Sequence, residues 1–254
     1  MTLPMLADFA LRLACGLGVL LLITPWREVP LAFYRTHCLV ILGLLVLAGL
    51  DVSRFALEPR LLGAILSASV LAYLAAVAWG LGLPRVGRPL LAFLVVIGIG
   101  VLVAVSRASD PVFWLLNGSG RLASAFLMGS TLTAMLLGHH YLTAPAMTMV
   151  PLKRFVLCIG WGLGIRALIG SVGLGVWLNS STTSAGIADV SPLFLAVRWG
   201  MGMAGPALAT WMTWKTVEIH STQSATGILY IAMTLVLFGE LTAMALSRGA
   251  GIVF

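Results

Sequence analysis

The stretch "PLLAFLVVIGIGVLVAV", residues 89–105, contains 17 residues and no charged side chain. About 20 apolar residues in a helix cross the hydrocarbon core of a bilayer. Seven further stretches of about 17 to 25 residues have the same character and lack the alternation of β-strands. Only helices and closed barrels satisfy every backbone N–H and C=O group in lipid. The sequence therefore predicts eight spanning helices, at 7–24, 30–50, 61–83, 89–105, 119–142, 153–178, 192–217 and 222–246.

The composition agrees with an all-α, polytopic transmembrane bundle. Hydrophobic residues make up 60% of the chain and charged residues only 9%, with a mean hydropathy of +1.07. A soluble domain carries about 25% charged residues. The loops between the apolar stretches are short, so we expect one helical membrane domain over residues 1–254 and no soluble domain. No internal repeat is evident in the sequence, which leaves an inverted-repeat transporter architecture without support.

The positive charges indicate membrane placement rather than nucleic-acid binding. The net charge is +7, but the 15 Lys and Arg residues are scattered between apolar stretches. Basic residues beside a membrane contact anionic lipid and accumulate on the cytoplasmic side. Eight spans place both termini at one face, and a small excess of Lys and Arg at the opposite face predicts that this opposite face is cytoplasmic. We expect an integral protein of a bacterial inner membrane that contacts lipid and other membrane subunits.

Away from the helix ends, four ionisable residues stand out in the predicted helices: Arg121, Arg166, Arg198 and Glu240. A charge near the centre of a membrane costs about 2.5–3.5 kcal/mol and should face the bundle interior. Arg198 and Glu240 lie at similar depth on consecutive helices, so we predict an ion pair between them, with Arg166 deeper. The pair could simply fix helix register. Because three arginines accompany one acid, the group could also bind an anion, a quinone carbonyl or a cofactor propionate.

The four histidines, His37, His139, His140 and His220, all fall near the face opposite the termini. Neighbouring residues on a helix point about 100° apart, so only one of the adjacent pair can face His37. One hypothesis is that His37 and one of the adjacent pair, assigned as His139 with His140 as the alternative, are the axial ligands of a b-type haem. His220 lies at the same site, and Arg35, Lys153 or Arg154 would meet the haem propionates. The alternative is that the imidazoles interact with the membrane interface and the negative end of the helix dipole.

Glycine patterns in the sixth and seventh helices have a structural interpretation. Gly160 and Gly164 form a small-xxx-small pair, which predicts close helix packing. The letters "GMGMAG" at 200–205 match a dinucleotide-binding fingerprint, but they lie inside a predicted spanning helix rather than after a strand. We expect a kink at Gly205 and Pro206 instead.

Three functions fit these observations. The favoured one is a membrane subunit of a respiratory or redox assembly that binds haem b or quinone. The second is a transporter or channel for a small anionic or polar solute, and the third is a structural subunit without a ligand. No Ser–His–acid set, carboxylate pair or phosphate loop can be assembled, so an enzymatic role would be that of a subunit in an oxidoreductase complex.

Overall fold

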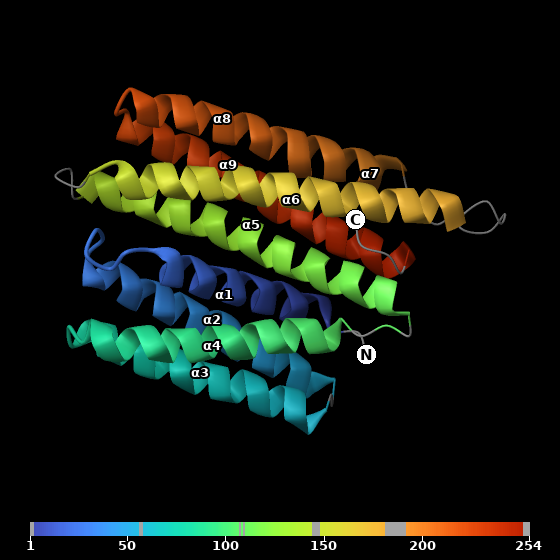
Figure 1. Ribbon diagram of the computed structural model, residues 1–254, viewed down its shortest axis with the longest axis horizontal. Coiled ribbons are helices and arrows are strands. Elements are labelled where there is room, and N and C mark those ends of the chain that lie inside the picture. The colour runs from blue at the N-terminus through green and yellow to red at the C-terminus, as the bar shows by residue number, and fades with distance from the viewer. Residues whose placement is uncertain are drawn as a thin grey trace.

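The computed structural model describes residues 3–55, 58–106, 108, 110–143, 148–180 and 192–250, almost all of them helical. Short turns connect α1 to α2, α3 to α4 and α8 to α9 (Figure 1). Their bounds are α1 Met5–Ile23, α2 Leu31–Arg54, α3 Pro59–Gly80, α4 Pro84–Val105, α5 Pro111–Thr143, α6 Val150–Ser180, α7 Pro192–Trp199, η1 Gly200–Ala204, α8 Gly205–Glu218 and α9 Thr222–Ala250.

The predicted helical membrane bundle is confirmed. Seven helices in the described ranges are long and apolar enough to span a membrane. The remaining predicted span is one continuous helix, over residues 192–218, that a π-helical turn divides into α7, η1 and α8. Both ends of the described chain lie at the same end of the bundle (Figure 1), where the Arg248 guanidinium donates a hydrogen bond to the carbonyl of Leu3.

Two helices begin earlier than the apolar pattern predicts. α4 begins at Pro84 rather than at Pro89, because proline fits the first helical turn, where its missing N–H has no helical partner to lose. α5 begins at Pro111, and the Asp110 carboxylate accepts a hydrogen bond of 2.7 Å from the N–H of Val112. Proline in the first turn of α4 and the Asp110 cap of α5 thus begin each helix before the stretch that the apolar pattern predicts.

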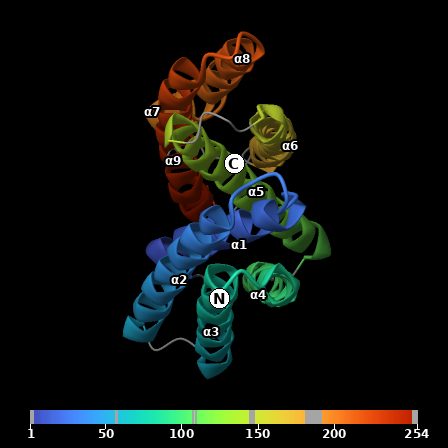
Figure 2. The same cartoon turned by 90° about the vertical axis from the view of Figure 1, so that its left-hand side faces the viewer.

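The helices form two halves, α1–α4 and α5–α9, that pack in the same order. In the first half, α1 contacts α2 and α4, and α3 packs between α2 and α4. In the second half, α5 contacts α6 and α9, and α8 packs between α6 and α9. Viewed along the bundle, the halves lie on opposite sides of the central α1–α5 pair (Figure 2). Each half contains four spans, so the halves run parallel. The packing thus shows two four-span units with the same arrangement, although no repeat is evident in the amino-acid sequence.

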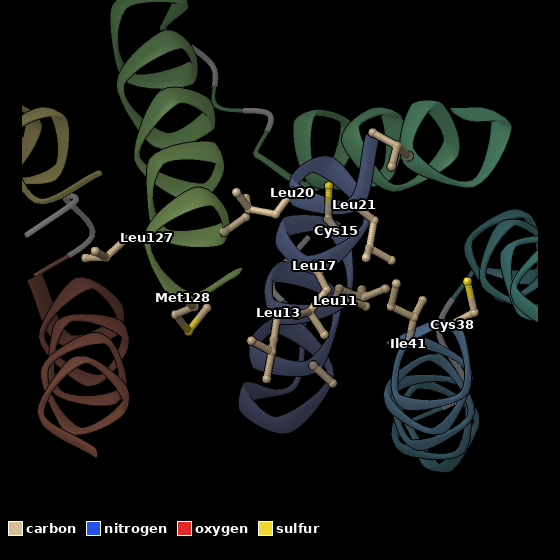
Figure 3. Packing of buried hydrophobic residues seen from close by; sticks show 14 of the residues in the cluster. Leu11, Leu13, Cys15, Leu17, Leu20, Leu21, Cys38, Ile41, Leu127 and Met128 are labelled. Carbon is tan, nitrogen blue, oxygen red and sulfur yellow. The ribbon is translucent and has the colours of Figure 1, made fainter. Parts of the chain in front are cut away.

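Direct backbone contact joins the two halves. A Cβ added at Gly16 of α1 would lie 1.8 Å from the carbonyl oxygen of Ala125, and one at Gly129 of α5 would lie 2.3 Å from the backbone of Gly16. Glycine is therefore required at both positions. Around this contact, buried side chains of α1 extend toward both α2 and α5 (Figure 3). α1 is accordingly the most enclosed of the seven recognised spans.

The outer surface is apolar, as a lipid-facing surface requires. Exposed fractions reach 64% for Phe93, 67% for Leu168 and 55% for Phe238, on three different helices. Such extensive apolar exposure is unusual for a soluble monomer.

A π-helical turn, η1, lies directly before Gly205 and Pro206, the position at which the sequence predicts a kink. The N–H of Gly205 donates to the carbonyl of Gly200, five residues earlier. Pro206 has no N–H, and its ring would clash with the carbonyl four residues before it in an α-helix. The wider turn accommodates the ring. No strand precedes "GMGMAG" within the described part of the chain, in agreement with its rejection as a nucleotide fingerprint.

The expectation for Gly160 and Gly164 is wrong. A Cβ at either position would meet nothing within 4 Å, so neither glycine mediates close packing. The tight glycine contact of α6 is at Gly162, where a Cβ would lie 3.2 Å from the Cα of Leu127 on α5. The sequence spacing identifies a small face of α6, but not which face meets another helix.

Candidate anion-binding site

Glu240 of α9 lies fully buried between two buried arginines. Arg166 Nε is 3.1 Å from Oε1 and 3.2 Å from Oε2 of Glu240, and Arg198 Nη1 is 3.0 Å from Oε1. The predicted Arg198–Glu240 pair is thus confirmed. Arg166, predicted to lie deeper, shares the same carboxylate.

Glycines allow Arg198 to reach this carboxylate. A Cβ at Gly202 of η1 would lie 2.6 Å from the Cα of Gly239, and one at Gly239 of α9 would lie 2.3 Å from the Cα of Gly202. The two backbones therefore touch, and Arg198 Nη1 also donates to the carbonyl of Gly239 at 3.3 Å. The glycines of "GMGMAG" serve helix contact, and the contact holds the ion pair in place.

A second buried acid extends the network toward the termini. Asp8 of α1 accepts two hydrogen bonds from Arg12, at 3.0 and 2.8 Å, and a further one from Arg121 of α5. Asp8 and Arg12 are 4% and 7% exposed. A carboxylate held by two guanidinium groups is well satisfied.

Ser124 of α5 connects the two acidic centres. Arg12 Nη1 donates to the hydroxyl oxygen of Ser124 at 3.3 Å, and Ser124 and Arg12 both lie close enough to interact electrostatically with Glu240. We call the resulting group the arginine cluster; its members are Asp8, Arg12, Arg121, Ser124, Arg166, Arg198 and Glu240. It crosses from the first half of the molecule into the second.

The arginine cluster carries more positive than negative charge. Among its residues, four guanidinium groups face two carboxylates. Arg166 Nη1 and Arg198 Nη2 are buried and have no hydrogen-bond partner among the described residues, although each side chain is only 1% exposed. A buried charged donor without a partner is costly. Guanidinium groups bind carboxylate and phosphate oxygens in a two-point geometry, so the cluster has the chemistry of an anion site.

Asp8, Arg12 and Ser124 are members that the sequence interpretation missed. Asp8 and Arg12 are spaced four residues apart, which places them on one face of a helix. Because both residues lie near a helix end, the sequence suggests ordinary charges at the membrane–water interface. The i,i+4 spacing, together with an unpaired Arg121 at the same end of the bundle, was the available signal.

The histidines divide into two inner and two outer residues. His37 is 1% exposed; its Nδ1 lies 2.7 Å from the carbonyl oxygen of Phe33, and its Nε2 is buried without a partner among the described residues. The ring of Phe33 is 3.9 Å from that of His37 and 6.5 Å from that of His140, centroid to centroid. His139 is exposed. The inner member of the adjacent pair is therefore His140 and not His139, the residue named as a haem ligand.

The remaining residues of the predicted haem site lie at the surface. Arg35 is exposed and its side chain lies against Gly80 of α3. His220 is exposed in the turn between α8 and α9, with a left-handed φ of 60°. No group of three or more His, Cys, Asp or Glu among the described residues could hold a metal ion. An axial haem pair needs only two ligands, so haem binding stays a prediction.

No known protein family, curated protein or solved structure matches this chain.

Proposed function

We propose that this chain binds a small anion with carboxylate or phosphate oxygens in the arginine cluster, and acts as a transporter or channel component within a bacterial inner membrane. The observation that carries the proposal is the pair of buried guanidinium nitrogens, Arg166 Nη1 and Arg198 Nη2, that lack a hydrogen-bond partner in the part of the chain that the structure describes. A ligand oxygen would satisfy both donors and offset the excess positive charge.

The position of the arginine cluster supports transport. It lies beside the central α1–α5 pair, where the two parallel halves meet. Transporters built from two repeats commonly bind substrate where the repeats meet, near the middle of the membrane. Glu240 would hold the two arginines in position while their free nitrogens face the anion.

Ligand binding can be tested by thermal stability in detergent at constant ionic strength. Chloride would be replaced in turn by acetate, succinate, phosphate or sulfate. We expect a saturable rise in the unfolding temperature with at least one of them, because a ligand at 100 times its dissociation constant stabilises by about 2.7 kcal/mol.

Arg198→Lys keeps the positive charge but removes the planar guanidinium group that binds two oxygens at once. The anion concentration that gives half of the maximal stabilisation should therefore rise at least about tenfold. Arg35→Lys, at an exposed arginine, is the matched control and should not change it. Uptake of the stabilising anion into proteoliposomes then tests transport directly. The proposal fails if none of the anions stabilises the folded protein. It also fails if Arg198→Lys responds to the anion as the wild type and the Arg35→Lys control do.

The redox subunit is a second candidate because His37 Nε2 is buried near His140 and has no hydrogen-bond partner among the described residues. In this proposal, His37 and His140 hold haem b within a larger respiratory complex, or the arginine cluster meets a quinone carbonyl. A reduced-minus-oxidised absorption spectrum of the purified protein is the test. His37→Leu should abolish a haem band and His139→Leu should leave it, whereas a colourless folded protein would exclude the haem form.

A further inference from the structure

An open groove of 720 Å³ separates α6 from η1 and α8. Its floor includes Gly160 and Gly164, beside which a Cβ would meet nothing within 4 Å. Trp161, Trp211 and Trp214 flank it. The equivalent pair in the other half, α2 and α3, packs closely together, so the groove distinguishes the second half.

The dimensions of the groove fit a lipid acyl chain. Its lining on α6 extends from Val156 to Ala167, which corresponds to about 16 Å along the helix axis. That length is about half of the 30 Å hydrocarbon core, the depth of one leaflet. The volume of 720 Å³ lies within the usual range of ligand pockets.

One end of the groove, which we call its mouth, is basic. It lies toward the face opposite the termini, where α6 begins and α8 ends, with Val156 and Trp214 in the lining. Lys215 pairs with Glu218 at 2.9 Å, and Trp214 donates to the same carboxylate at 2.7 Å. Lys153 of α6 lies close enough to interact electrostatically with Glu218. Two ammonium groups thus face one carboxylate at this mouth, a balance that favours a negatively charged head group.

We infer that the groove between α6 and α8 holds one anionic phospholipid. Its acyl chain lies along Gly160 and Gly164, and its phosphate lies at the interface between Lys153 and Lys215. Trp214 stands where tryptophan commonly contacts the head-group region. This site is separate from the arginine cluster and does not depend on the proposed anion function.

Native mass spectrometry of the purified chain tests the inference. Protein in mild detergent would be mixed with equal amounts of phosphatidylglycerol and phosphatidylcholine that have identical acyl chains. We expect one phosphatidylglycerol per chain to persist after detergent washing. Lys153→Gln and Lys215→Gln should each lower the preference for phosphatidylglycerol about fivefold, the usual effect of one basic residue beside anionic lipid.

Filling the groove should remove the lipid irrespective of its head group. Gly164→Leu and Ala207→Leu each add a side chain to the lining, and retention should fall at least about tenfold. Gly100→Leu on α4, where a Cβ also meets nothing within 4 Å, is the matched control and should retain the lipid.

Three outcomes would overturn the inference. In the first, the wild type retains phosphatidylglycerol and phosphatidylcholine equally. In the second, Gly164→Leu and Ala207→Leu retain as much lipid as Gly100→Leu. A lipid-free dimer that Gly164→Leu dissociates would instead show that a second copy of the chain occupies the groove.

Discussion

The two halves of the molecule share a packing order but fill their interiors with different chemistry. In the first half, α2 and α3 meet through an aromatic contact, in which Tyr34 stacks on Trp79 with 4.2 Å between ring centroids. In the second half, Arg166, Arg198 and Glu240 occupy the interior, and α6 and α8 leave a groove between them. Apart from Asp8 and Arg12 of α1, which belong to the arginine cluster, the interior of the first half is largely apolar. The comparison teaches that one helix arrangement can be filled mainly by apolar side chains or can hold buried charge.

The two kinds of interior respond differently to change. An aromatic interior depends on area and shape, so a conservative replacement loses a limited amount of free energy. A buried ion pair depends on charge balance, because each member is stable only while its partner remains. Substitutions in the two halves should therefore differ in magnitude, and the following predictions run from the largest effect to the smallest.

Glu240→Gln should be the most damaging single substitution. It leaves the buried Arg166 and Arg198 without their carboxylate, which should cost about 3–5 kcal/mol of folding free energy. The amount of monodisperse protein and its unfolding temperature, measured by fluorescence-detected size-exclusion chromatography, report the loss. The triple variant Arg166→Met, Arg198→Met and Glu240→Met should recover much of it. Equal damage from the single and triple variants would contradict this charge-balance explanation.

Gly16→Ala should weaken the contact between the halves by about 1–3 kcal/mol, because the added Cβ overlaps the carbonyl of Ala125. Gly100→Ala adds the same methyl group to open space and serves as the control. Unfolding in denaturant would show a lower midpoint for the first variant only. A Gly16→Ala protein as stable as the control would mean that α1 and α5 can separate without cost.

The eight spans could be predicted from the sequence, because the cost of exposing backbone polar groups to lipid leaves few alternatives. Equal depth on consecutive helices was enough to pair Arg198 with Glu240. The contact of Asp8 with Arg121 depends on the crossing of α1 and α5 at Gly16 and Gly129, and one sequence does not specify a crossing. Gly160 and Gly164 show the same limit, because small residues permit contact without requiring it.

Trp79→Phe, in the first half, should cost about 1–2 kcal/mol, because one ring stacked on Tyr34 is kept but the smaller side chain leaves a cavity at this fully buried position. The indole Nε1 of Trp79 has no hydrogen-bond partner among the described residues, so no bond to it is lost. The stabilisation by an anion should be unchanged, since the arginine cluster is untouched. Loss of the anion response in this variant would show that the first half participates in binding.

Glu28→Gln should have the smallest effect. Glu28, just before α2, pairs with Arg154 of α6 at 2.9 Å and joins the halves at the surface, where the two side chains are 33% and 52% exposed. Exposed ion pairs contribute about 0–1 kcal/mol and are screened by salt. Any difference from the wild type should disappear in 1 M NaCl, and a difference that persists would indicate that the pair is buried in the membrane-embedded protein.

The π-helical turn before Pro206 has a genetic consequence. A π turn corresponds to one extra residue in an α-helix, so it behaves as a single-codon insertion. Deleting one codon within Gly200–Ala204 would restore ordinary helical phase and rotate α8 by about 100° relative to α7. Arg198 would keep its place on α7, while a different side of α8 would face α6. The lining of the groove and the position of the arginine are thus adjustable by separate, very small changes in the gene.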